Sequence, residues 1–551
     1  MIDHPLTARV LPKVLRDAAE AQPEVPFIFF GKDVYSYAEM ELRTSQFAHG
    51  LRRWGVKRGS RVALIMDNCP EFIISWFALA KIGAITVPIN TSMRGPLLRY
   101  YTVDSDCTHV IVHAHYLEAL AEARRGDPAV PTVVLPSDGA IAGVRSAGPG
   151  WHDLFSDGEA LREQSLDVEL NVWDPWLIVY TSGTTGPSKG SVCPFGHSIS
   201  IGRTQAQRLA LTPDDRMYTC FPLYHGNALN YSTLTALWGR SAIVLAPRFS
   251  ASRFWSDINH YRVSIFYSNG AITRWLENLP VTPEEASNPA RISVIVPNPL
   301  NRRELEARWG VKILSQYGMS EASQIAYLGD EGYDKPRTAG RISPTLDVRI
   351  VDENDIELPR GKTGEVTLRA KEPWTHLIEY YGKPEATAKA FRNLWFHTGD
   401  RGYIDEDGFF FFVDRVKTSI KRRGENVSAF EVEAALQRHP GIAEAAAIPV
   451  PYQPGDDEVG IFVVRSDQNL TEREVIEFAI DNMAYFMVPR YVRFVDELPK
   501  TATAKVRKGE LIDFAKQSLP DMWDRETAGI EVNRFTASKR AAATGKKSES
   551  V

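Results

Sequence analysis

Residues 180–190 read YTSGTTGPSKG and directly follow the apolar run WLIVY at 176–180. The apolar run predicts a short buried strand, so a loop rich in glycine and hydroxyl residues leaves the end of a strand. Glycines let backbone N–H groups turn toward phosphate oxygens, hydroxyls add donors, and Lys189 supplies a positive charge for β- and γ-phosphates. The loop is not a Walker loop, because Ser188 stands where that pattern has a glycine. A surface linker would explain glycine and serine, but not the preceding strand and the lysine.

The segments around this loop alternate between strand-like and helix-like patterns. Residues 61–66 (RVALIM) and 108–113 (THVIVH) predict buried strands, and residues 37–54 predict an amphipathic helix. The fold class is therefore α/β, with a large amino-terminal domain of stacked α/β sheets that are mostly parallel. From Asp347 onward, closely spaced alternating strands predict a β-rich subdomain.

The length of 551 residues predicts more than one domain. A basic, glycine-containing loop leads into a new helix after residue 412, and we place the junction at Lys417. Residues 1–416 are then a large amino-terminal domain, and residues 417–525 a small α+β domain. Residues 526–551 are small, polar and charged, so they predict a flexible tail.

The composition is that of an ordinary globular protein, with 44% apolar residues, 24% charged residues and a net charge of -5. These values argue against a disordered chain and against a nucleic-acid-binding surface dominated by basic residues. A small ligand that is anionic or apolar is expected instead. Nothing in the sequence excludes a homodimer.

The cysteines lie far apart and form no Cys-x-x-Cys pair, which argues against a disulfide framework and favours a reducing compartment. They are Cys69, Cys107, Cys193 and Cys220. His109, His113 and His115 follow Cys107 on a predicted strand, where packed or solvated histidines are more common than a zinc site. The amino terminus lacks the apolar region of a secretory signal, so a cytoplasmic location is expected.

One apolar stretch, residues 72–89, approaches the length of a membrane-spanning helix. Lys81 lies in its middle and Pro88 near its end. We therefore expect a buried helix that runs into a strand, and no membrane span.

The loop at 180–190 resembles the phosphate loop of the adenylate-forming superfamily. That superfamily contains acyl-CoA synthetases, luciferase-like enzymes and the adenylation domains of peptide synthetases. The resemblance implies that the loop binds ATP and that its first threonine, Thr181, also contacts a metal ion. The implied ATP-binding residues are Thr181, Ser182, Gly183, Thr184, Thr185, Gly186 and Lys189.

A second motif, QYGMSE at 316–321, resembles the aromatic-Gly-x-Thr/Ser-Glu motif of the same family. The resemblance implies that the Tyr317 ring lies against adenine, that Ser320 binds phosphate and that Glu321 holds Mg²⁺. The residue types agree, because an aromatic face can stack on a purine and a carboxylate is a suitable hard ligand for Mg²⁺. Gln316 and Gly318 are assigned to the same nucleotide site.

Two motifs that follow in family order complete the nucleotide site. In WFHTGD at 395–400, the resemblance implies that Asp400 accepts hydrogen bonds from both ribose hydroxyls. In DRVK at 414–417, Arg415 would reach the ribose and Lys417 would be the pivot between the domains. An isolated Arg-x-Lys pair is usually a charged surface feature, but this pair has the family spacing after Asp400.

The carboxy-terminal region carries the elements that serve the two steps of the family's reaction. These steps are formation of an acyl-adenylate and transfer of the acyl group to a thiol. LPKTATAKVRK at 498–508 resembles the motif whose lysine catalyses adenylation, which is Lys505 here. Ala504 replaces the usual glycine before it. After domain rotation, Gly424 would approach the pantetheine arm of coenzyme A, and Lys421 and its neighbours Arg422 and Arg423 would meet its phosphates. Basic loop residues are more often simply solvated.

The segment FPLYHGNA at 221–228 resembles the motif that lines the acyl pocket, with His225 near the substrate carboxylate or gating a tunnel. No aspartate stands there to pair with an α-amine, so an amino acid substrate is disfavoured. Asn298, in the unusual run PNP at 297–299, is assigned to the adenine site. Residues 264–272 predict a further wall whose aromatic and small residues suit a hydrophobic acid, bulky and cyclic acids included.

Together these motifs predict an acyl-CoA synthetase that uses ATP, Mg²⁺ and coenzyme A, with Lys505, His225 and Glu321 as catalytic residues. The resemblance implies that residues 1–416 are the adenylation domain, which holds the ATP and acyl sites, and that residues 417–525 are mobile. The resemblance is strongest to crotonobetaine/carnitine-CoA ligase-like enzymes and to medium- or long-chain acyl-CoA synthetases. The alternative is a ligase that transfers the acyl group to the phosphopantetheine of a carrier protein. A luciferase-like oxygenase would need a special substrate, and a non-catalytic relative would not be expected to retain the charged motif residues.

Overall fold

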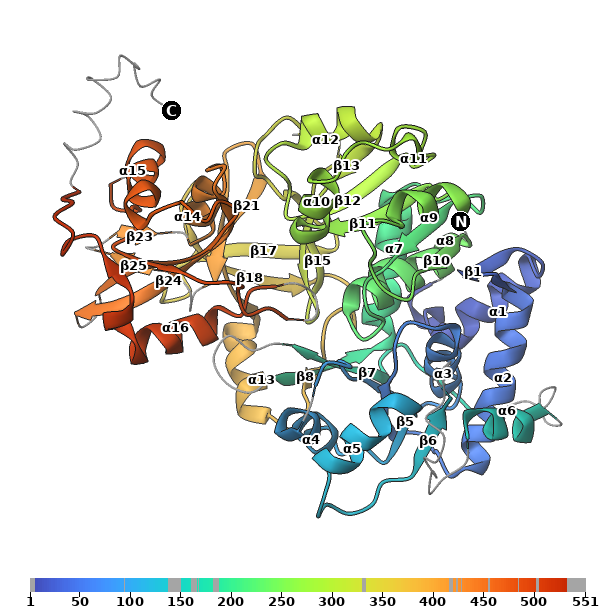
Figure 1. Ribbon diagram of the computed structural model, residues 1–551. Coiled ribbons are helices and arrows are strands. Elements are labelled where there is room, and N and C mark those ends of the chain that lie inside the picture. The colour runs from blue at the N-terminus through green and yellow to red at the C-terminus, as the bar shows by residue number, and fades with distance from the viewer. Residues whose placement is uncertain are drawn as a thin grey trace.

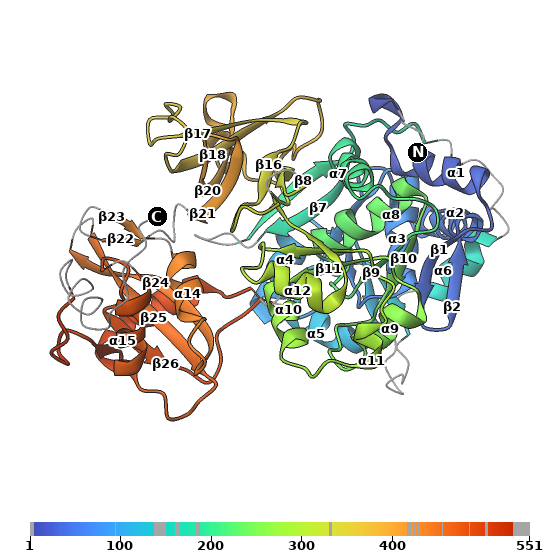
Figure 2. The same ribbon diagram turned by 90° about the horizontal axis from the view of Figure 1, so that it is seen from above.

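A computed structural model describes most of the chain (Figure 1). The described residues are 5–93, 95–136, 150–159, 166, 168–181, 188–329, 333–415, 420–422, 425–427, 429–453, 456–483, 485–501 and 505–532. They form a large amino-terminal domain that contains three sheets, and a small carboxy-terminal domain that lies beside it (Figure 2). The mixed α/β class expected from the sequence is confirmed.

The first sheet of the large domain has the strand order β13-β12-β11-β9-β10-β1-β2 and is parallel except for the β1–β2 hairpin. Its strands are β1 (Pro26–Phe30), β2 (Asp33–Ser36), β9 (Arg216–Thr219), β10 (Ala242–Leu245), β11 (Ile265–Asn269), β12 (Ile292–Val296) and β13 (Lys312–Leu314). This sheet carries at its carboxyl ends the segments that contain His225 and Asn298.

The second sheet has the order β19-β8-β7-β4-β3-β5-β6 and carries the phosphate loop between β7 and β8. Its strands are β3 (Arg61–Ile65), β4 (Ile85–Pro88), β5 (His109–His113), β6 (Thr132–Leu135), β7 (Pro175–Thr181), β8 (Lys189–Pro194) and β19 (Glu379–Tyr380). The predicted strands near residues 61–66, 108–113 and 176–180 are confirmed within about one residue at their ends.

The helices of the large domain cover and separate these sheets (Figure 1). They are α1 (Leu11–Ala21), α2 (Tyr37–Arg53), α3 (Pro70–Lys81), α4 (Gly95–Asp104), α5 (Leu117–Ala123), α6 (Trp151–Glu159), α7 (Phe195–Arg208), α8 (Thr235–Gly239), α9 (Phe254–His260), α10 (Gly270–Glu277), α11 (Pro283–Ala286), α12 (Arg302–Trp309) and α13 (Pro384–Ala390), with the π-helical segment η3 (Asn227–Leu234). Helix α2 begins at a capping box in which Ser36 and Glu39 bond reciprocally.

The apolar segment 72–89 forms the buried helix α3 followed by strand β4, as predicted. Lys81 is buried, and its ammonium lies 2.6 Å from a Glu41 carboxylate oxygen and 2.8 Å from Ser45 Oγ. The charge in this segment is therefore compensated inside the protein. Among the described residues, no helix has both the length and the apolar character needed to cross a bilayer.

The β-rich subdomain begins earlier than the predicted start at Asp347. Its sheet has the order β14-β15-β16-β21-β20-β18-β17. The strands are β14 (Gln316–Met319), β15 (Ser323–Tyr327), β16 (Gly340–Ile342), β17 (Leu346–Val351), β18 (Gly364–Ala370), β20 (Phe396–Ile404) and β21 (Phe409–Arg415). Strands β14 and β15 are short and rich in polar residues, so they lack the alternating pattern that marks β17 and β18.

The carboxy-terminal domain is built on the sheet β24-β25-β26-β27 and the ribbon β22-β23. Its elements are β22 (Ile420–Arg422), β23 (Glu425–Val427), α14 (Ala429–Leu436), β24 (Ile442–Gln453), β25 (Asp456–Arg465), α15 (Glu472–Asn482), β26 (Tyr491–Phe494), α16 (Lys508–Gln517) and β27 (Trp523–Asp524). The proposed pivot Lys417 lies outside the described residues, so the 416/417 boundary stays a prediction.

The predicted tail begins too early at residue 526. Arg525 is buried, and its guanidinium donates hydrogen bonds to the carbonyl oxygens of Pro489 (3.2 Å) and Ile530 (3.0 Å). Ile530 and Val532 also pack against the core of the carboxy-terminal domain. Residues 526–532 therefore belong to this domain. The buried guanidinium of Arg525 requires hydrogen-bond acceptors, and the Ile530 carbonyl oxygen is one of them.

Of the histidines that follow Cys107, two are packed and His115 is exposed, and the packed ones do not surround that cysteine. His109 and His113 are buried, and His113 Nε2 lies 3.9 Å from the sulfur of Cys69. Cys107 instead lies 3.0 Å from Ser105 Oγ. All four cysteines are buried and free, in agreement with the absence of a disulfide framework.

Asn68 joins the two large sheets at the place where the His225 segment begins. Its amide nitrogen donates hydrogen bonds to the carbonyl oxygens of Phe221 and Ala246, both at 2.9 Å. Its amide oxygen accepts from the Leu223 N–H at 2.8 Å. Asn68 follows β3 of the second sheet, whereas these partners follow β9 and β10 of the first. One side chain therefore holds the acyl-site segment in register with the opposite sheet.

We predict that Asn68→Ala lowers the free energy of unfolding of the large domain by about 2–4 kcal/mol, because it leaves three buried backbone groups without partners. Urea denaturation followed by tryptophan fluorescence measures this loss. Asn354→Ala, at an exposed turn, is the matched control and should change stability by less than about 0.5 kcal/mol. Equal stability of the two variants would contradict the role of Asn68.

Candidate active site

The amino-terminal end of the phosphate loop lies against Glu321. Thr181 ends strand β7, and its hydroxyl donates a hydrogen bond to Glu321 Oε1 at 3.2 Å. Tyr380 donates to the same oxygen, also at 3.2 Å. Glu321 is buried, and its oxygen atoms are of the hard type that Mg²⁺ prefers. The structure thus brings together the two residues assigned to the metal ion, although they are 140 positions apart.

The other end of the loop places Lys189 in the same region. Thr181 and Lys189 face each other across the antiparallel pair β7 and β8. The ammonium of Lys189 lies 4.9 Å from the centre of the Tyr380 ring. Five of the predicted loop residues, Ser182, Gly183, Thr184, Thr185 and Gly186, lie outside the described residues.

Tyr380 was missed by the sequence analysis, although its ring and hydroxyl contact both ends of this site. Burial and the neighbouring Glu321 carboxylate raise the pKa of Tyr380 well above its usual range, so the hydroxyl stays protonated and can donate. Strand β19 places Tyr380 beside β8. The residue follows no motif considered above, so its sequence carried no local signal.

The nucleotide motifs on the β-rich sheet also converge. The Tyr317 hydroxyl donates a 2.7 Å hydrogen bond to Asp400 Oδ2. The Tyr317 ring stacks on Phe410, with ring centres 5.0 Å apart. Asp400 lies opposite Arg415 in the pairing of β20 with β21, although the Arg415 side chain is not among those described. The adenine and ribose residues expected from the sequence therefore form one cluster.

Glycine is required at position 318. A Cβ atom at Gly318 would lie 2.5 Å from the Ser323 carbonyl oxygen and 2.8 Å from the Tyr231 hydroxyl. Ser320 lies close to the His225 segment, because its hydroxyl is 4.0 Å from the place of a Cβ at Gly226. The phosphate motif and the acyl motif are thus neighbours.

Asn298 lies on the turn after β12, where the sequence departs from the glycine-rich family pattern. Its amide nitrogen donates a 3.1 Å hydrogen bond to the Thr338 carbonyl oxygen. Its amide oxygen is buried and has no hydrogen-bond partner among the described residues. A buried acceptor of this kind requires a donor, and the exocyclic amine of adenine is a suitable one.

His225 lies at the start of the acyl-site segment and is electrostatically coupled to Lys505. Its Nδ1 atom accepts a hydrogen bond from the Asn227 N–H at 3.2 Å. Although His225 is exposed, desolvation by the surrounding protein, assisted by the positive charge of Lys505, lowers the pKa of His225 to about 4. The imidazole is therefore neutral at pH 7. The same electrostatic interaction places Lys505, on the small domain, near His225 on the large domain.

A direct contact between the domains was not expected from the sequence. Arg274, on α10, donates a 2.5 Å hydrogen bond to the Ala443 carbonyl oxygen. It donates a second hydrogen bond, 2.8 Å long, to Gln437 Oε1. Helix α10 continues directly from β11, the strand that contains the predicted acyl wall. Arg274 therefore connects that wall to the carboxy-terminal domain.

The basic loop assigned to coenzyme A is only partly described. Arg422 is buried, with its guanidinium 2.8 Å from Glu458 and hydrogen bonds to the Phe486 and Val488 carbonyl oxygens. The expectation that Arg422 meets coenzyme A phosphates is wrong for this arrangement, because its charge is already paired inside the domain. Lys421 lies on β22 opposite Asn426, whereas Arg423 and Gly424 lie outside the described residues.

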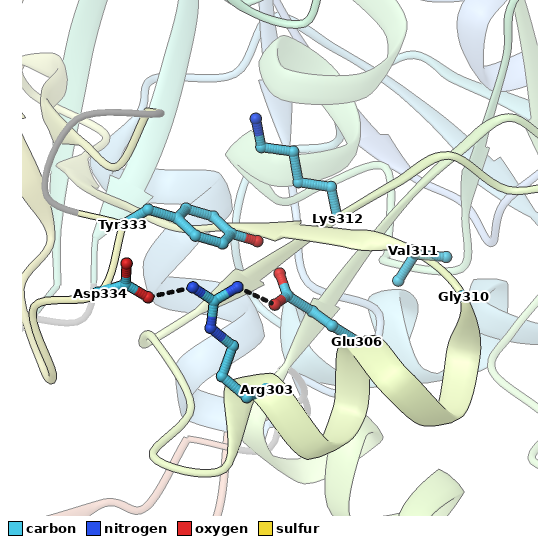
Figure 3. Close-up of a pocket in the computed structure, with 7 residues that line it drawn as sticks. All are labelled: Arg303, Glu306, Gly310, Val311, Lys312, Tyr333 and Asp334. Carbon is cyan, nitrogen blue, oxygen red and sulfur yellow. Dashed lines mark hydrogen bonds and ion pairs between the residues drawn. The ribbon is translucent and has the colours of Figure 1, made fainter.

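A surface hollow of about 560 Å³ lies apart from these residues (Figure 3). Arg303 pairs there with Glu306 and Asp334, and its guanidinium lies 4.9 Å from the Tyr333 ring centre. The lining contains none of the motif residues and its charges pair with one another, so we do not assign this hollow to the activity.

The chain is similar to proteins of known families over most of its length. The AMP-binding enzyme family matches residues 15–375, and the AMP-binding enzyme C-terminal domain matches residues 431–505. A crotonobetaine/carnitine–CoA ligase of Salmonella paratyphi A is 33% identical over 87% of this chain and 93% of its own length.

Solved structures give the same assignment. ATP-bound MatB from Rhodopseudomonas palustris is 26% identical and superposes with a TM-score of 0.81, covering 92% of this chain and 99% of MatB. The apo form of MatB, with the same coverage and 28% identity, gives a TM-score of 0.70. With both family domains matched and a curated relative above 30% identity, the chain belongs to the AMP-binding enzyme family of adenylate-forming ligases.

Proposed function

We propose that this protein is an AMP-forming acyl-CoA synthetase that activates a hydrophobic carboxylic acid, bulky and cyclic acids included. It would first form an acyl-adenylate and release pyrophosphate, and then transfer the acyl group to coenzyme A and release AMP. The observation that carries the proposal is the convergence of Thr181, Glu321, Tyr317 and Asp400, from three separate motifs, through two direct hydrogen bonds.

The nucleotide would lie between the phosphate loop and the β-rich sheet. Asp400 would accept hydrogen bonds from the ribose, Tyr317 would stack against adenine, and Asn298 would accept from the adenine amine. Residues 182–186 and Lys189 would bind the phosphates. Gly318 would let the backbone approach the nucleotide, and Arg415 would reach the ribose.

The residues around Glu321 fit a magnesium ion. The Glu321 carboxylate and the Thr181 hydroxyl are hard oxygen ligands 3.2 Å apart. Mg²⁺ bound there would neutralise negative charge on the ATP phosphates. Tyr380, which donates to the same carboxylate, would hold Glu321 in place.

The chemical difficulty of adenylation is that a carboxylate must attack the phosphate of an anion. Positive charge and alignment therefore matter more than proton transfer. Lys189 and Lys505 supply that charge from opposite domains. His225 is neutral at pH 7, so it can donate a hydrogen bond to the substrate carboxylate or line the tunnel without adding charge.

The domain arrangement supports the first half-reaction. Lys505 lies near the acyl site, and the superposition is better on ATP-bound MatB than on its apo form. The second half-reaction would need rotation about Lys417, which would withdraw Lys505 and bring Gly424 and Lys421 toward coenzyme A. Lys417→Pro would restrict that rotation.

The function is tested by incubating the purified protein with ATP, Mg²⁺, coenzyme A and a panel of fatty, aromatic and polycyclic acids. We expect pyrophosphate release with at least one acid, and a thioester with free coenzyme A detected by mass spectrometry. Pyrophosphate release without transfer to coenzyme A would instead indicate a carrier-protein ligase. The absence of acid-dependent pyrophosphate release across the panel would contradict the proposal.

We predict that Lys505→Ala slows carboxylate-dependent pyrophosphate exchange by about 100-fold or more, because it removes a preorganised positive charge from the reacting anions. Thioester formation from supplied acyl-adenylate should be much less affected. Lys516→Ala, at an exposed position of the same domain, is the control and should retain wild-type exchange. Normal exchange by Lys505→Ala would rule out its catalytic role.

We predict that Arg274→Ala lowers pyrophosphate exchange by about 10-fold, because it removes both hydrogen bonds that hold the small domain in this orientation. Thioester formation from supplied acyl-adenylate should stay within about 2-fold of wild type. Arg253→Ala removes an exposed guanidinium of the large domain and serves as the control. An equal loss of both half-reactions would show that Arg274 supports the fold rather than the orientation.

A further inference from the structure

The side-chain amide of Gln316 is held in a single orientation. Its oxygen accepts hydrogen bonds from Arg208 (2.8 Å), from Gln324 (2.9 Å) and from Gln205. Because a guanidinium can only donate, the oxygen rather than the nitrogen of Gln316 must face Arg208. The Gln316 amide nitrogen therefore points away from this cluster.

The Gln316 nitrogen lacks a protein partner. No hydrogen bond from it is made to any described residue, and it is not among the buried side-chain atoms that lack partners. The nitrogen is thus accessible, although the Gln316 side chain as a whole is buried. An amide donor with a fixed direction and no protein acceptor is suited to binding a ligand atom.

Arg208 makes this region electropositive. Its guanidinium donates to the Ser315 and Leu328 carbonyl oxygens at 2.7 and 3.1 Å and lies over the Tyr327 ring. No carboxylate pairs with Arg208 among the described residues, and burial lowers its pKa to about 10. Even with this shift the group is charged at pH 7. A cationic group on a ligand would therefore be repelled here.

Two tyrosine side chains lie beside the cluster formed by Gln316, Arg208, Gln205 and Gln324. Tyr231 and Tyr267 both act electrostatically on Arg208, so they lie near its guanidinium. The Tyr267 hydroxyl is buried and has no hydrogen-bond partner among the described residues. Tyr231 lies six positions after His225 on η3, and its hydroxyl faces Gly318, two residues after Gln316. The cluster is therefore next to the acyl-site segment.

We propose that Gln316, oriented by Arg208, belongs to the acyl site rather than to the nucleotide site expected from the sequence. It is a specificity-determining residue that donates a hydrogen bond to an oxygen atom in the acyl part of the substrate. The preferred acid would be mainly apolar but would carry a hydroxyl, keto or carboxylate oxygen, and acids with a quaternary ammonium group would be rejected. This inference rests on the acyl-CoA synthetase function proposed above. Tyr267 and Tyr231 would supply further polar contacts at the same end of the pocket.

A purely supporting role for the Gln316 cluster makes a different prediction. If the cluster only held α7 against β14, its loss would lower stability and would lower the activity toward all substrates equally. A specificity residue would affect acids that carry the oxygen and leave unsubstituted acids unchanged. Gln316→Glu separates these roles, because it keeps an oxygen acceptor for Arg208 and removes the amide donor.

The test compares octanoic and 3-phenylpropanoic acids with positional series of their hydroxy and keto derivatives, with octanedioic acid and with crotonobetaine. We expect wild-type kcat/KM for pyrophosphate release to be at least about 10-fold higher for one oxygen-bearing acid than for its parent. Gln316→Glu should abolish that preference, so that kcat/KM falls by at least about 10-fold more for the oxygen-bearing acid than for its parent. Tyr267→Phe should weaken the preference without loss of thermal stability, because it removes an unpaired hydroxyl.

Gln207→Glu is the matched control. Gln207 is exposed on α7, the helix that carries Arg208, so this substitution should not change the preference. Binding of non-hydrolysable acyl-adenylate analogues by calorimetry gives a second readout that needs no turnover. The inference would be overturned, and the proposed function left intact, by either of two results. One is a preference for parent acids over every oxygen-bearing derivative, and the other is an equal effect of Gln316→Glu on parent acids and oxygen-bearing acids. No acid-dependent pyrophosphate release at all would overturn the proposed function, and the inference with it.

Discussion

Mutual repulsion between two anions is the constraint on which this active site depends. A carboxylate and the phosphates of ATP approach each other only if positive charge and hydrogen-bond donors surround them. In the proposed function, the fold would meet this constraint with Lys189 at the end of one sheet, with a Mg²⁺ ion held by Glu321 beside a second sheet, and with Lys505 on a separate domain. Because these groups come from three units, the relative placement of those units controls the chemistry.

Close packing between the sheets holds the large-domain groups in place. Trp76 and Trp176 stack with ring centres 5.1 Å apart, and Trp176 stacks on Phe195 of α7 at 4.9 Å. Asn68 adds three hydrogen bonds between the sheets at the edge of the acyl site. The aromatic contacts bury apolar surface. Asn68 sets the position of the two large sheets relative to each other, because hydrogen bonds are directional and dispersion contacts are not.

Among the described residues, the contacts that Arg274 and Lys505 make between the small and the large domain are polar. Arg274 reaches the small domain through two hydrogen bonds, and Lys505 acts on His225 through its charge. Such contacts can break and form again at modest free-energy cost, whereas the apolar core of each domain cannot. This difference suits an enzyme in which one domain must present different residues in two successive reactions.

The α/β class and the order of the motifs could be predicted from the amino-acid sequence, and the structure brings Thr181 to Glu321 and Tyr317 to Asp400 as expected. These features are readable because strand periodicity and loop chemistry are local properties. The folded protein adds what no motif predicted: Tyr380 contacts Glu321, Arg422 is buried against Glu458, β14 belongs to the β-rich sheet, and Arg208 orients Gln316. Most of these contacts join residues far apart in the chain, and all depend on how sheets and helices pack, which short-range patterns do not encode.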